Sequence, residues 1–348
     1  MVKILYLTVA FAKQVPLRLY KERGGSCLKL LFRRMSAFRI FTQSILMMKH
    51  NIVNEVQSGN RNSLARLISL VENEAEGYGD LLAGLQINRS VPVIGITGPP
   101  GAGKSTLINA LLKYISDAEP ASRIAVLAVD PTSPFTHGAL LGDRLRMNEH
   151  YSNNNIYIRS IATRGAMGGL SAKTLEITDV LRAASFDYIF VETVGVGQSE
   201  VEVAALADTT IVVFVPESGD DIQTIKSGIM EIADIFVVNK CDREGADILV
   251  KNITSTLHER IRNEWDIPVV KTVAHQGKGL DELIKHIKLH HAVAHQQDKG
   301  RLLAEQAYRI IQRQRMRGVS IQALQQELGE AVKKQEFNIY KFLEKHYK

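Results

Sequence analysis

The fold of this chain is decided by the stretch Gly98-Pro99-Pro100-Gly101-Ala102-Gly103-Lys104-Ser105. It stands between an apolar run typical of a strand and a pattern typical of a helix, and in that context a glycine-rich turn lets backbone N–H groups surround phosphate oxygens at a helix N-terminus. We expect Lys104 to neutralise the β- and γ-phosphates as a catalytic residue and the Ser105 hydroxyl to ligate Mg²⁺. The stretch and the following Thr106 therefore predict a nucleotide-binding P-loop.

Further apolar runs indicate alternating strands and helices along the chain. Each run is short, continuous and rich in Val and Ile, as buried parallel strands are. The runs are 91–97, 124–129, 188–191, 210–215, 235–238 and 269–273. The sequence therefore predicts an α/β fold of the P-loop NTPase type, with a mostly parallel central sheet.

Helical segments are expected on both sides of this nucleotide-binding domain. Before it, apolar residues recur at helical spacing, and Asn60 and Asn62 are the expected caps between two helices. After it, apolar and charged positions alternate at helical spacing as far as residue 345. The expected segments are a basic extension (1–50), an N-terminal helical segment (51–90), the G domain (91–290) and a C-terminal helical arm (291–348).

The formal net charge of +6 comes from the N-terminal end of the 348 residues. Residues 1–50 hold ten of the 43 Lys and Arg residues and one of the 37 Asp and Glu residues, which leaves 33 basic and 36 acidic residues, net −3, in the remainder. A slightly acidic body gives no reason to expect nucleic acid as a partner. No apolar run reaches the roughly 18–20 residues that span a bilayer, so no membrane partner is expected either.

The basic extension has three interpretations. It is an upstream start that adds non-functional sequence before Met47 or Met48, a targeting segment that resembles a secretory signal or an organellar transit peptide, or an ordered helix. A nucleotide-dependent enzyme needs cytosolic or matrix nucleotide, which argues against secretion. Cys27 and Cys241 do not have the spacing of a disulfide framework. They are therefore expected to be two free thiols in a reducing compartment. We expect a cytoplasmic protein, or a mitochondrial matrix protein if the extension is a transit peptide.

The base of the nucleotide is predicted to meet Asn239-Lys240-Cys241-Asp242, which follows the run 235–238. The Asp242 carboxylate can accept hydrogen bonds from guanine N1–H and the 2-amino group, a donor pair that adenine lacks. Lys240 can lie along the base plane. After the next run, the loop of Val273, Ala274 and His275 is expected to offer backbone N–H groups to guanine O6. With the P-loop, these residues predict a GTPase.

Several carboxylates are candidates for holding Mg²⁺ or its water molecules. They follow predicted parallel strands, whose carboxyl ends meet at one edge of a sheet. Mg²⁺ takes few direct carboxylates and several waters, so only some of the candidates are expected to touch the ion. The candidates are Asp130, Asp143, Glu192, Asp220 and Asp221.

The segment that begins Glu192-Thr193-Val194-Gly195 stands where many GTPases carry Asp-x-x-Gly. We expect Glu192 and Gly195 to act in catalysis, with the Gly195 N–H sensing the γ-phosphate. The position that would carry a water-orienting Gln is Val196, and the nearest Gln is Gln198. Slow intrinsic hydrolysis is therefore predicted, with faster hydrolysis when a partner rearranges the segment.

Together these residues resemble the MeaB/ArgK/MMAA family of P-loop GTPases over roughly residues 50–345. The resemblance rests on 98–106, 129–131, 141–143, 191–200 and 219–223 with Lys226 and Gly228. It implies a homodimeric chaperone of adenosylcobalamin-dependent acyl-CoA mutases, chiefly methylmalonyl-CoA mutase, which couples GTP hydrolysis to cofactor loading and to protection of the mutase. The segment 158–165 departs from the pattern expected for the family.

The resemblance also implies roles for individual positions. Asp143 and Glu192 would serve Mg²⁺, and the C-terminal helices would form the dimer arm. The Lys226 side chain would relay the partner's signal as a catalytic residue of a third switch that also carries Asp220. The implied switches are 129–147, 192–200 and 217–228.

Three other functions compete with this one. A pure scaffold with a degenerate nucleotide site is disfavoured because Lys104, Ser105, Glu192 and Asp242 are all present. A metallochaperone GTPase for a nickel enzyme would need a metal-collecting site, for which the candidates are the i, i+4 pairs His286/His290 and His291/His295. No Cys joins them, and histidines on a solvated helix are common. A transport-associated ATPase is disfavoured because the motif ending at Asp242 selects guanine and no ABC-type signature follows the P-loop.

Overall fold

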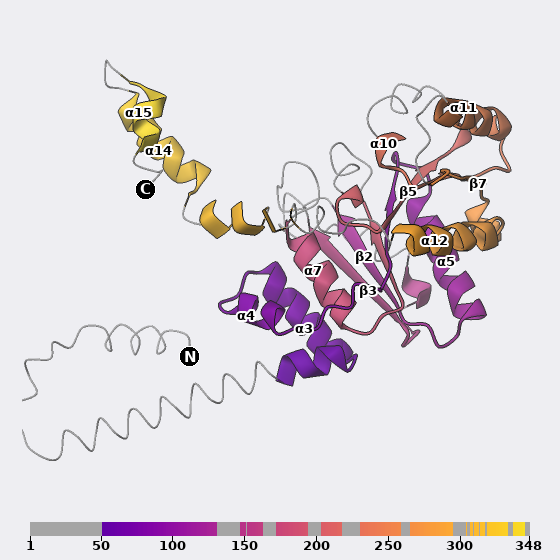
Figure 1. Ribbon diagram of the computed structural model, residues 1–348, viewed down its shortest axis with the longest axis horizontal. Helices are drawn as coiled ribbons and strands as arrows, with labels where there is room; N and C mark the ends of the chain where they lie inside the picture. The colour runs from indigo at the N-terminus through magenta and orange to yellow at the C-terminus, as the bar shows by residue number, and fades with distance from the viewer. Residues whose placement is uncertain are drawn as a thin grey trace, which may run out of the picture. The chain divides into compact units, whose positions relative to one another are not determined.

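The computed structural model describes most of the chain from residue 51 onward (Figure 1). The described residues are 51–130, 147–150, 152–162, 172–193, 203–217, 230–258, 265–294, 304, 307–308, 310–312, 314–316, 319–332 and 337–344. The chain divides into two units, Met1–Glu55 and Val56–Lys348. Of the first unit only 51–55 are described, and these residues are helical. Within the described ranges, no helix combines the length and apolarity that crossing a membrane requires.

A seven-stranded parallel sheet forms the centre of the second unit. Its order is β3-β2-β4-β1-β5-β6-β7, and every neighbouring pair is parallel. The strands are β1 Val93–Thr97, β2 Ile124–Asp130, β3 Ile156–Ala162, β4 Tyr188–Glu192, β5 Thr209–Phe214, β6 Ile235–Val238 and β7 Val269–Lys271. The predicted α/β fold is confirmed, and β1 lies between β4 and β5, so the loop after β1 emerges at the middle of the sheet.

Strand β3 was not expected from the sequence. Its apolar run is interrupted by Arg159 and Ser160, and it lies at the edge of the sheet beside β2 alone. The Arg159 guanidinium leaves the sheet and donates to Glu72 Oε2 at 2.9 Å and to Ser69 Oγ at 3.2 Å. At the other edge, β7 ends at Lys271, earlier than the predicted run, because Val273 pairs with Lys278 in an isolated antiparallel bridge instead.

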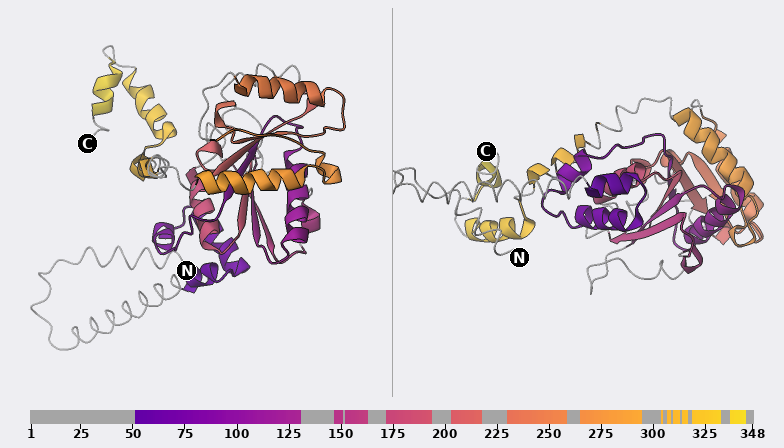
Figure 2. Two further views of the ribbon diagram at one scale, coloured as in Figure 1. Left: turned by 45° about the vertical axis from the view of Figure 1, so that its right-hand side comes forward. Right: turned by 90° about the horizontal axis from the view of Figure 1, so that it is seen from below.

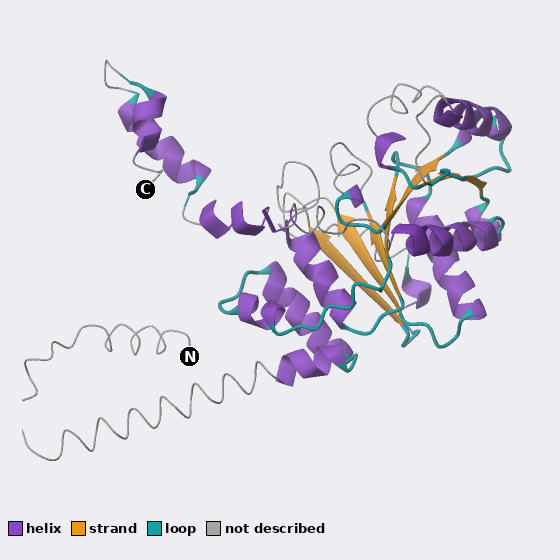
Figure 3. Ribbon diagram, viewed as in Figure 1, coloured by secondary structure: helices purple, strands orange, loops and turns teal. Residues whose placement is uncertain are grey.

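Helices cover both faces of the sheet (Figure 3). Helix α12 lies beside α5 on one face, as two further views show (Figure 2), and α7 packs between β4 and α3 on the other. Two 3₁₀ turns, η2 Asn148–His150 and η5 Ala274–Gln276, accompany the helices. The helices are α3 Arg61–Glu72, α4 Tyr78–Ala83, α5 Lys104–Ala118, α7 Ala172–Ala183, α10 Met230–Ile232, α11 Ala246–His258, α12 Leu280–Ala294, α14 Ile321–Ala331 and α15 Ile339–Leu343.

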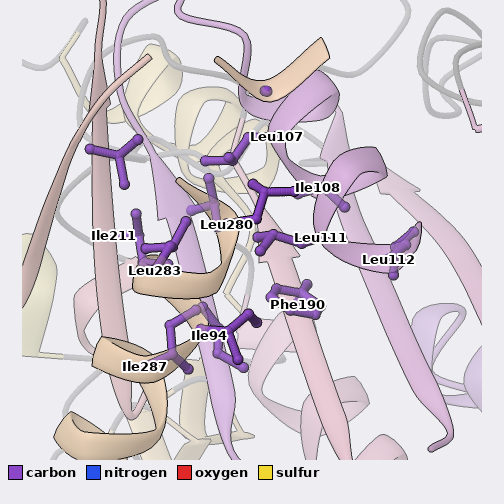
Figure 4. Packing of buried hydrophobic residues seen from close by; sticks show 14 of the residues in the cluster. Ile94, Leu107, Ile108, Leu111, Leu112, Phe190, Ile211, Leu280, Leu283 and Ile287 are labelled. Carbon is purple, nitrogen blue, oxygen red and sulfur yellow. The ribbon is translucent and has the colours of Figure 1, made fainter. Parts of the chain in front are cut away.

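The core fixes α5 against the sheet (Figure 4). Leu107 and Leu111 of α5 pack with Ile94 of β1 and Phe190 of β4, and all four side chains are fully buried. Complete burial of such a side chain stabilises a fold by about 1.5–3 kcal/mol. The first residues of α5 are therefore held firmly above the carboxyl ends of β1 and β4.

The N-terminal helices are attached to the G domain by polar contacts. Asn60 caps α3, its Oδ1 accepting from the N–H groups of Asn62 at 3.0 Å and Ser63 at 3.1 Å, so Asn62 lies in the first turn and is not itself a cap. The buried Lys173 of α7 donates to Tyr78 at 2.9 Å and to Glu176 at 2.5 Å. Lys173 Nζ also lies 3.5 Å from Glu74 Oε1, so this one ammonium joins α7 to both Glu74 and Tyr78.

Candidate functional site

The glycine-rich loop has a backbone that only glycine fits. Gly98 has φ of +139°, and a Cβ there would lie 2.2 Å from the carbonyl oxygen of Val213. Gly103 has φ of +87°, and a Cβ there would lie 2.6 Å from Asn239 Nδ2. The loop is therefore in contact with β5 and with the segment after β6, and it cannot accept larger residues at either position.

Lys104 opens α5 directly after this loop, and its side chain is buried. The Nζ atom donates to the carbonyl oxygens of Gly98 at 2.7 Å and Pro99 at 3.1 Å. A buried ammonium at a helix N-terminus places positive charge where phosphate oxygens are expected.

The Ser105 hydroxyl donates to Glu192 Oε1 at 2.6 Å, and both side chains are buried. The contact follows from the register of the sheet, in which Glu192 of β4 pairs with Ile96 of β1, while Ser105 lies in the first turn of α5. A hydroxyl and a carboxylate are hard oxygen donors, the type that Mg²⁺ takes. These two residues therefore fit a Mg²⁺ site in the chemistry of their donors and in their mutual distance.

The other predicted metal residues are only partly described. Asp130 ends β2, which is the neighbour of β4 in the sheet, so its backbone lies on the same edge as Glu192. Asp143 lies outside the described residues, as do Gly195, Val196 and Lys226. Asp220, Asp221 and Gln198 also fall in ranges that the structure does not describe.

Two threonines at this edge were not expected from the sequence. The Thr193 hydroxyl donates to Thr97 Oγ1 at 3.0 Å, and the exposed fractions of the two residues are 2% and 0%. Thr97 is the last residue of β1 and Thr193 directly follows β4. The sequence shows that Thr97 and Thr193 each stand at the end of an apolar run. Only the order of the strands in the sheet shows that the two side chains meet.

Asn239 connects the phosphate loop with the segment expected to bind the base. Its buried side chain donates from Nδ2 to the Ala102 carbonyl oxygen at 3.1 Å. Its Oδ1 accepts from Thr272 Oγ1 at 3.2 Å and from the Ala274 N–H at 3.1 Å. Three stretches of chain therefore meet on one amide.

Lys240 reaches back to the phosphate loop as well. It has φ of +57°, and its Nζ donates to the Gly101 carbonyl oxygen at 2.9 Å. The aliphatic stem of Lys240 can therefore lie along one face of a base. Asp242, two residues on, is exposed, so its carboxylate is open to a ligand.

The loop after β7 carries the three residues that are expected to meet guanine O6. Ala274 is buried and opens η5, while Val273 is buried and His275 is exposed. Because the Ala274 N–H donates to Asn239 Oδ1, it has to change partner before it can reach guanine O6. The role of this loop in base binding stays a prediction.

The candidate nickel histidines point to different partners. His290 is buried, with Nδ1 at 2.9 Å from Thr209 Oγ1 and Nε2 at 3.3 Å from Asp234 Oδ1. Its ring meets Trp265 edge to face with centroids 4.9 Å apart, and the Trp265 indole N–H donates to the Asp234 carbonyl oxygen at 2.8 Å.

The neighbouring histidines have partners of their own. His291 Nε2 is 3.1 Å from the Ser90 carbonyl oxygen, and His286 Nε2 is 3.9 Å from Glu282 Oε1. His295 lies outside the described residues. Across the part of the chain that the structure describes, no three His, Cys, Asp or Glu side chains group as metal ligands.

Comparison with known proteins gives a consistent result. The family model described as methylmalonyl Co-A mutase-associated GTPase MeaB matches residues 64–332. A protein of Pyrococcus horikoshii that is named as a GTPase is 46% identical over 264 residues, covering 74% of this chain and 82% of that protein. GTPase ArgK of Escherichia coli is 37% identical over 242 residues, covering 66% of this chain and 72% of that protein.

One relative is part of a larger enzyme. The fused isobutyryl-CoA mutase of Geobacillus kaustophilus is 35% identical over 237 residues, which cover 64% of this chain and 22% of that protein. Among solved structures, the crystal structure of a LAO/AO transport system kinase matches with a TM-score of 0.60 and 28% identity, covering 83% of this chain and 87% of that one.

Proposed function

The chain belongs to the MeaB family of methylmalonyl-CoA mutase-associated GTPases, and we propose that it is a GTP-hydrolysing chaperone of a B12-dependent acyl-CoA mutase. In this proposal, GTP hydrolysis gates the loading of adenosylcobalamin into the mutase and protects the loaded enzyme. Methylmalonyl-CoA mutase is the proposed client.

The proposed phosphate chemistry uses the loop after β1. Lys104 neutralises the β- and γ-phosphates, and the backbone of 98–106 surrounds them. Ser105 and Glu192, together with Asp130 and Asp143, would hold Mg²⁺. The ion would supply positive charge that stabilises the negative charge developing during phosphoryl transfer. The observation that supports this assignment is the 2.6 Å hydrogen bond between Ser105 and Glu192.

Guanine recognition is proposed for the segment after β6. Asp242 pairs with guanine N1–H and the 2-amino group, and Lys240 covers the base. Asn239 couples base and phosphate recognition, because the same amide contacts Ala102 of the phosphate loop and Ala274 of the loop after β7. A guanine that draws the Ala274 N–H away from Asn239 would thereby act on the phosphate loop.

Association with a mutase is supported by the fused relative. In the Geobacillus kaustophilus protein, a segment similar to this chain is covalently part of an isobutyryl-CoA mutase. A separate chain of the same family would have to bind its mutase non-covalently. We assign this contact and its signal to the proposed third switch, 217–228, with Asp220 and with Lys226 as a catalytic relay.

A homodimer through the C-terminal arm is part of the proposal. None of the residues described in α14 and α15 is buried. Ile321 is 82% exposed and Tyr340 is 77% exposed. Apolar side chains that a single chain leaves open on helices are typical of a surface that a second copy covers.

The proposal is tested with purified methylmalonyl-CoA mutase. We expect the chain to bind the mutase with different affinities in GTP and GDP, and single-turnover GTP hydrolysis to be faster with the mutase present. Transfer of adenosylcobalamin, followed by its absorption spectrum, is expected to require GTP. Absence of binding in both nucleotides, together with an unchanged hydrolysis rate, would refute methylmalonyl-CoA mutase as the client; the same assay with isobutyryl-CoA mutase then tests the next client.

A further inference from the structure

The hydrogen bond between Thr193 and Thr97 lies one residue beyond the Ser105–Glu192 contact. Glu192 and Thr193 are consecutive, and successive side chains of a strand point to opposite faces of the sheet. Glu192 faces α5, where it meets Ser105. Thr193 meets Thr97. The end of β4 is thus attached on both of its faces.

Backbone pairing continues through the same point. The Thr193 N–H donates to the Ile96 carbonyl oxygen at 3.2 Å, which extends the ladder between β1 and β4 by one residue. Thr97 directly precedes Gly98, the first residue of the phosphate loop. The threonine pair therefore joins the chain at the start of the phosphate loop to the chain that carries Glu192.

We propose that Thr193 is a positioning residue for GTP hydrolysis, whose hydroxyl bond to Thr97 holds the Glu192 carboxylate against Ser105. Thr193 itself touches neither nucleotide nor metal ion in this proposal. Its effect passes through Glu192, so it concerns Mg²⁺ binding and the rate of the chemical step. Binding of nucleotide without Mg²⁺ depends on the phosphate loop and the base segment. Asn239 and Lys240 also hold that loop, through the carbonyl oxygens of Ala102 and Gly101, so this binding should persist when the threonine hydrogen bond is lost.

The experiment compares Thr193→Val, which keeps the shape and removes the hydroxyl, with Thr193→Ser, which keeps the hydroxyl. Two quantities are measured: the Mg²⁺ concentration that gives half-maximal GTP hydrolysis, and the release rate of a fluorescent GDP analogue in Mg²⁺ and in EDTA. For Thr193→Val we expect the half-maximal Mg²⁺ concentration to rise roughly three- to tenfold, the range that loss of one buried hydrogen bond produces. Release of the analogue should be faster in Mg²⁺ and unchanged in EDTA, and Thr193→Ser should behave as the wild type.

A matched control separates this effect from loss of a buried hydroxyl elsewhere. Thr178 is buried in α7 and donates to the Thr174 carbonyl oxygen at 2.7 Å. Thr178→Val should lower the melting temperature and leave the Mg²⁺ response unchanged. If Thr193→Val behaves as this control does, or if it changes analogue release equally in Mg²⁺ and EDTA, Thr193 has a structural role only and the proposal is overturned.

The double variant Thr97→Val/Thr193→Val covers the case in which the single variant does not fold. Replacing both partners by apolar groups of the same shape restores most of the lost stability, because no polar group is left without a partner. We expect its melting temperature to recover and its Mg²⁺ response to stay impaired. Recovery of both would show that the shape of the pair, and not its hydrogen bond, positions Glu192.

Discussion

Ser105 and Glu192 are 87 residues apart in the chain, and their side chains are joined by a hydrogen bond of 2.6 Å. The hydroxyl belongs to the first turn of α5 and the carboxylate to the last residue of β4. Both elements are fixed by the core that Leu107 and Phe190 share. The pair is therefore set up by the fold itself.

Glu192→Gln tests the carboxylate directly. The amide keeps the size of the side chain and removes the negative charge that we assign to Mg²⁺, so GTP hydrolysis should fall by about 10²-fold, the scale for losing one electrostatic contact in a transition state. Glu119→Gln serves as the control, because the Glu119 carboxylate accepts a hydrogen bond from Tyr188 at the amino end of β4, away from the phosphate loop. This variant should hydrolyse GTP at the wild-type rate. Equal rates for Glu192→Gln and the wild type would remove Glu192 from the metal site.

Lys104→Ala tests the phosphate loop. The change removes the ammonium that lies against Gly98 and Pro99, so we expect GTP turnover to fall below detection. Circular dichroism should show an unchanged fold, since α5 keeps its buried apolar side chains. Measurable turnover above that of a no-enzyme blank would contradict the assignment.

Asp242→Asn tests guanine selection. An amide cannot accept both hydrogen bonds from guanine N1–H and the 2-amino group, so the preference for GTP over ATP and XTP should relax while phosphate binding persists. Competition between labelled GDP and unlabelled nucleotides measures this. Asp247→Asn, an exposed carboxylate that accepts from Lys271, should leave the preference intact. An unaltered preference in Asp242→Asn would show that the base-site assignment is wrong.

His150 makes the stability of the fold depend on pH. Burial lowers its pKa below the usual 6.5, although the Glu149 carboxylate and a hydrogen bond to the backbone of Asn109 act in the opposite direction. His150 therefore binds a proton more readily in the unfolded chain than in the folded one. The free energy of unfolding decreases as the pH falls from the pKa of His150 in the unfolded chain toward its lower pKa in the folded chain. We expect the melting temperature to fall more steeply below about pH 6.5 in the wild type than in His150→Gln. Parallel pH profiles for the two proteins would contradict this.

The parts of the fold that could be predicted from the sequence are those that depend on residues close together in the chain. Gly98 and Gly103 need backbone angles and space that other residues lack, so the loop could be recognised from their spacing. Six of the seven strands were expected because buried parallel strands are continuously apolar. Strand β3 was missed because an edge strand tolerates polar residues, and Arg159 and Ser160 broke the pattern.

Contacts that depend on strand order could not be predicted. The carboxyl ends of the strands were expected to converge, but the pairing of Thr193 with Thr97 requires β4 to lie next to β1. The engagement of the Ala274 N–H with Asn239 depends in the same way on β6 lying next to β7. The roles of Asp143, Gly195 and Lys226 fall outside the described residues and stay predictions.

The packing of Trp265 on His290 has a practical consequence. Trp265 is the only tryptophan of the chain, and its indole N–H is bonded to Asp234, next to the amino end of β6. The phosphate loop and the base segment both follow the carboxyl ends of their strands, which is the opposite edge of the sheet from Asp234. Trp265 is thus an intrinsic fluorophore that lies far from the proposed nucleotide site. Its emission reports whether a variant is folded, so folding can be followed without a label and without perturbing GTP hydrolysis.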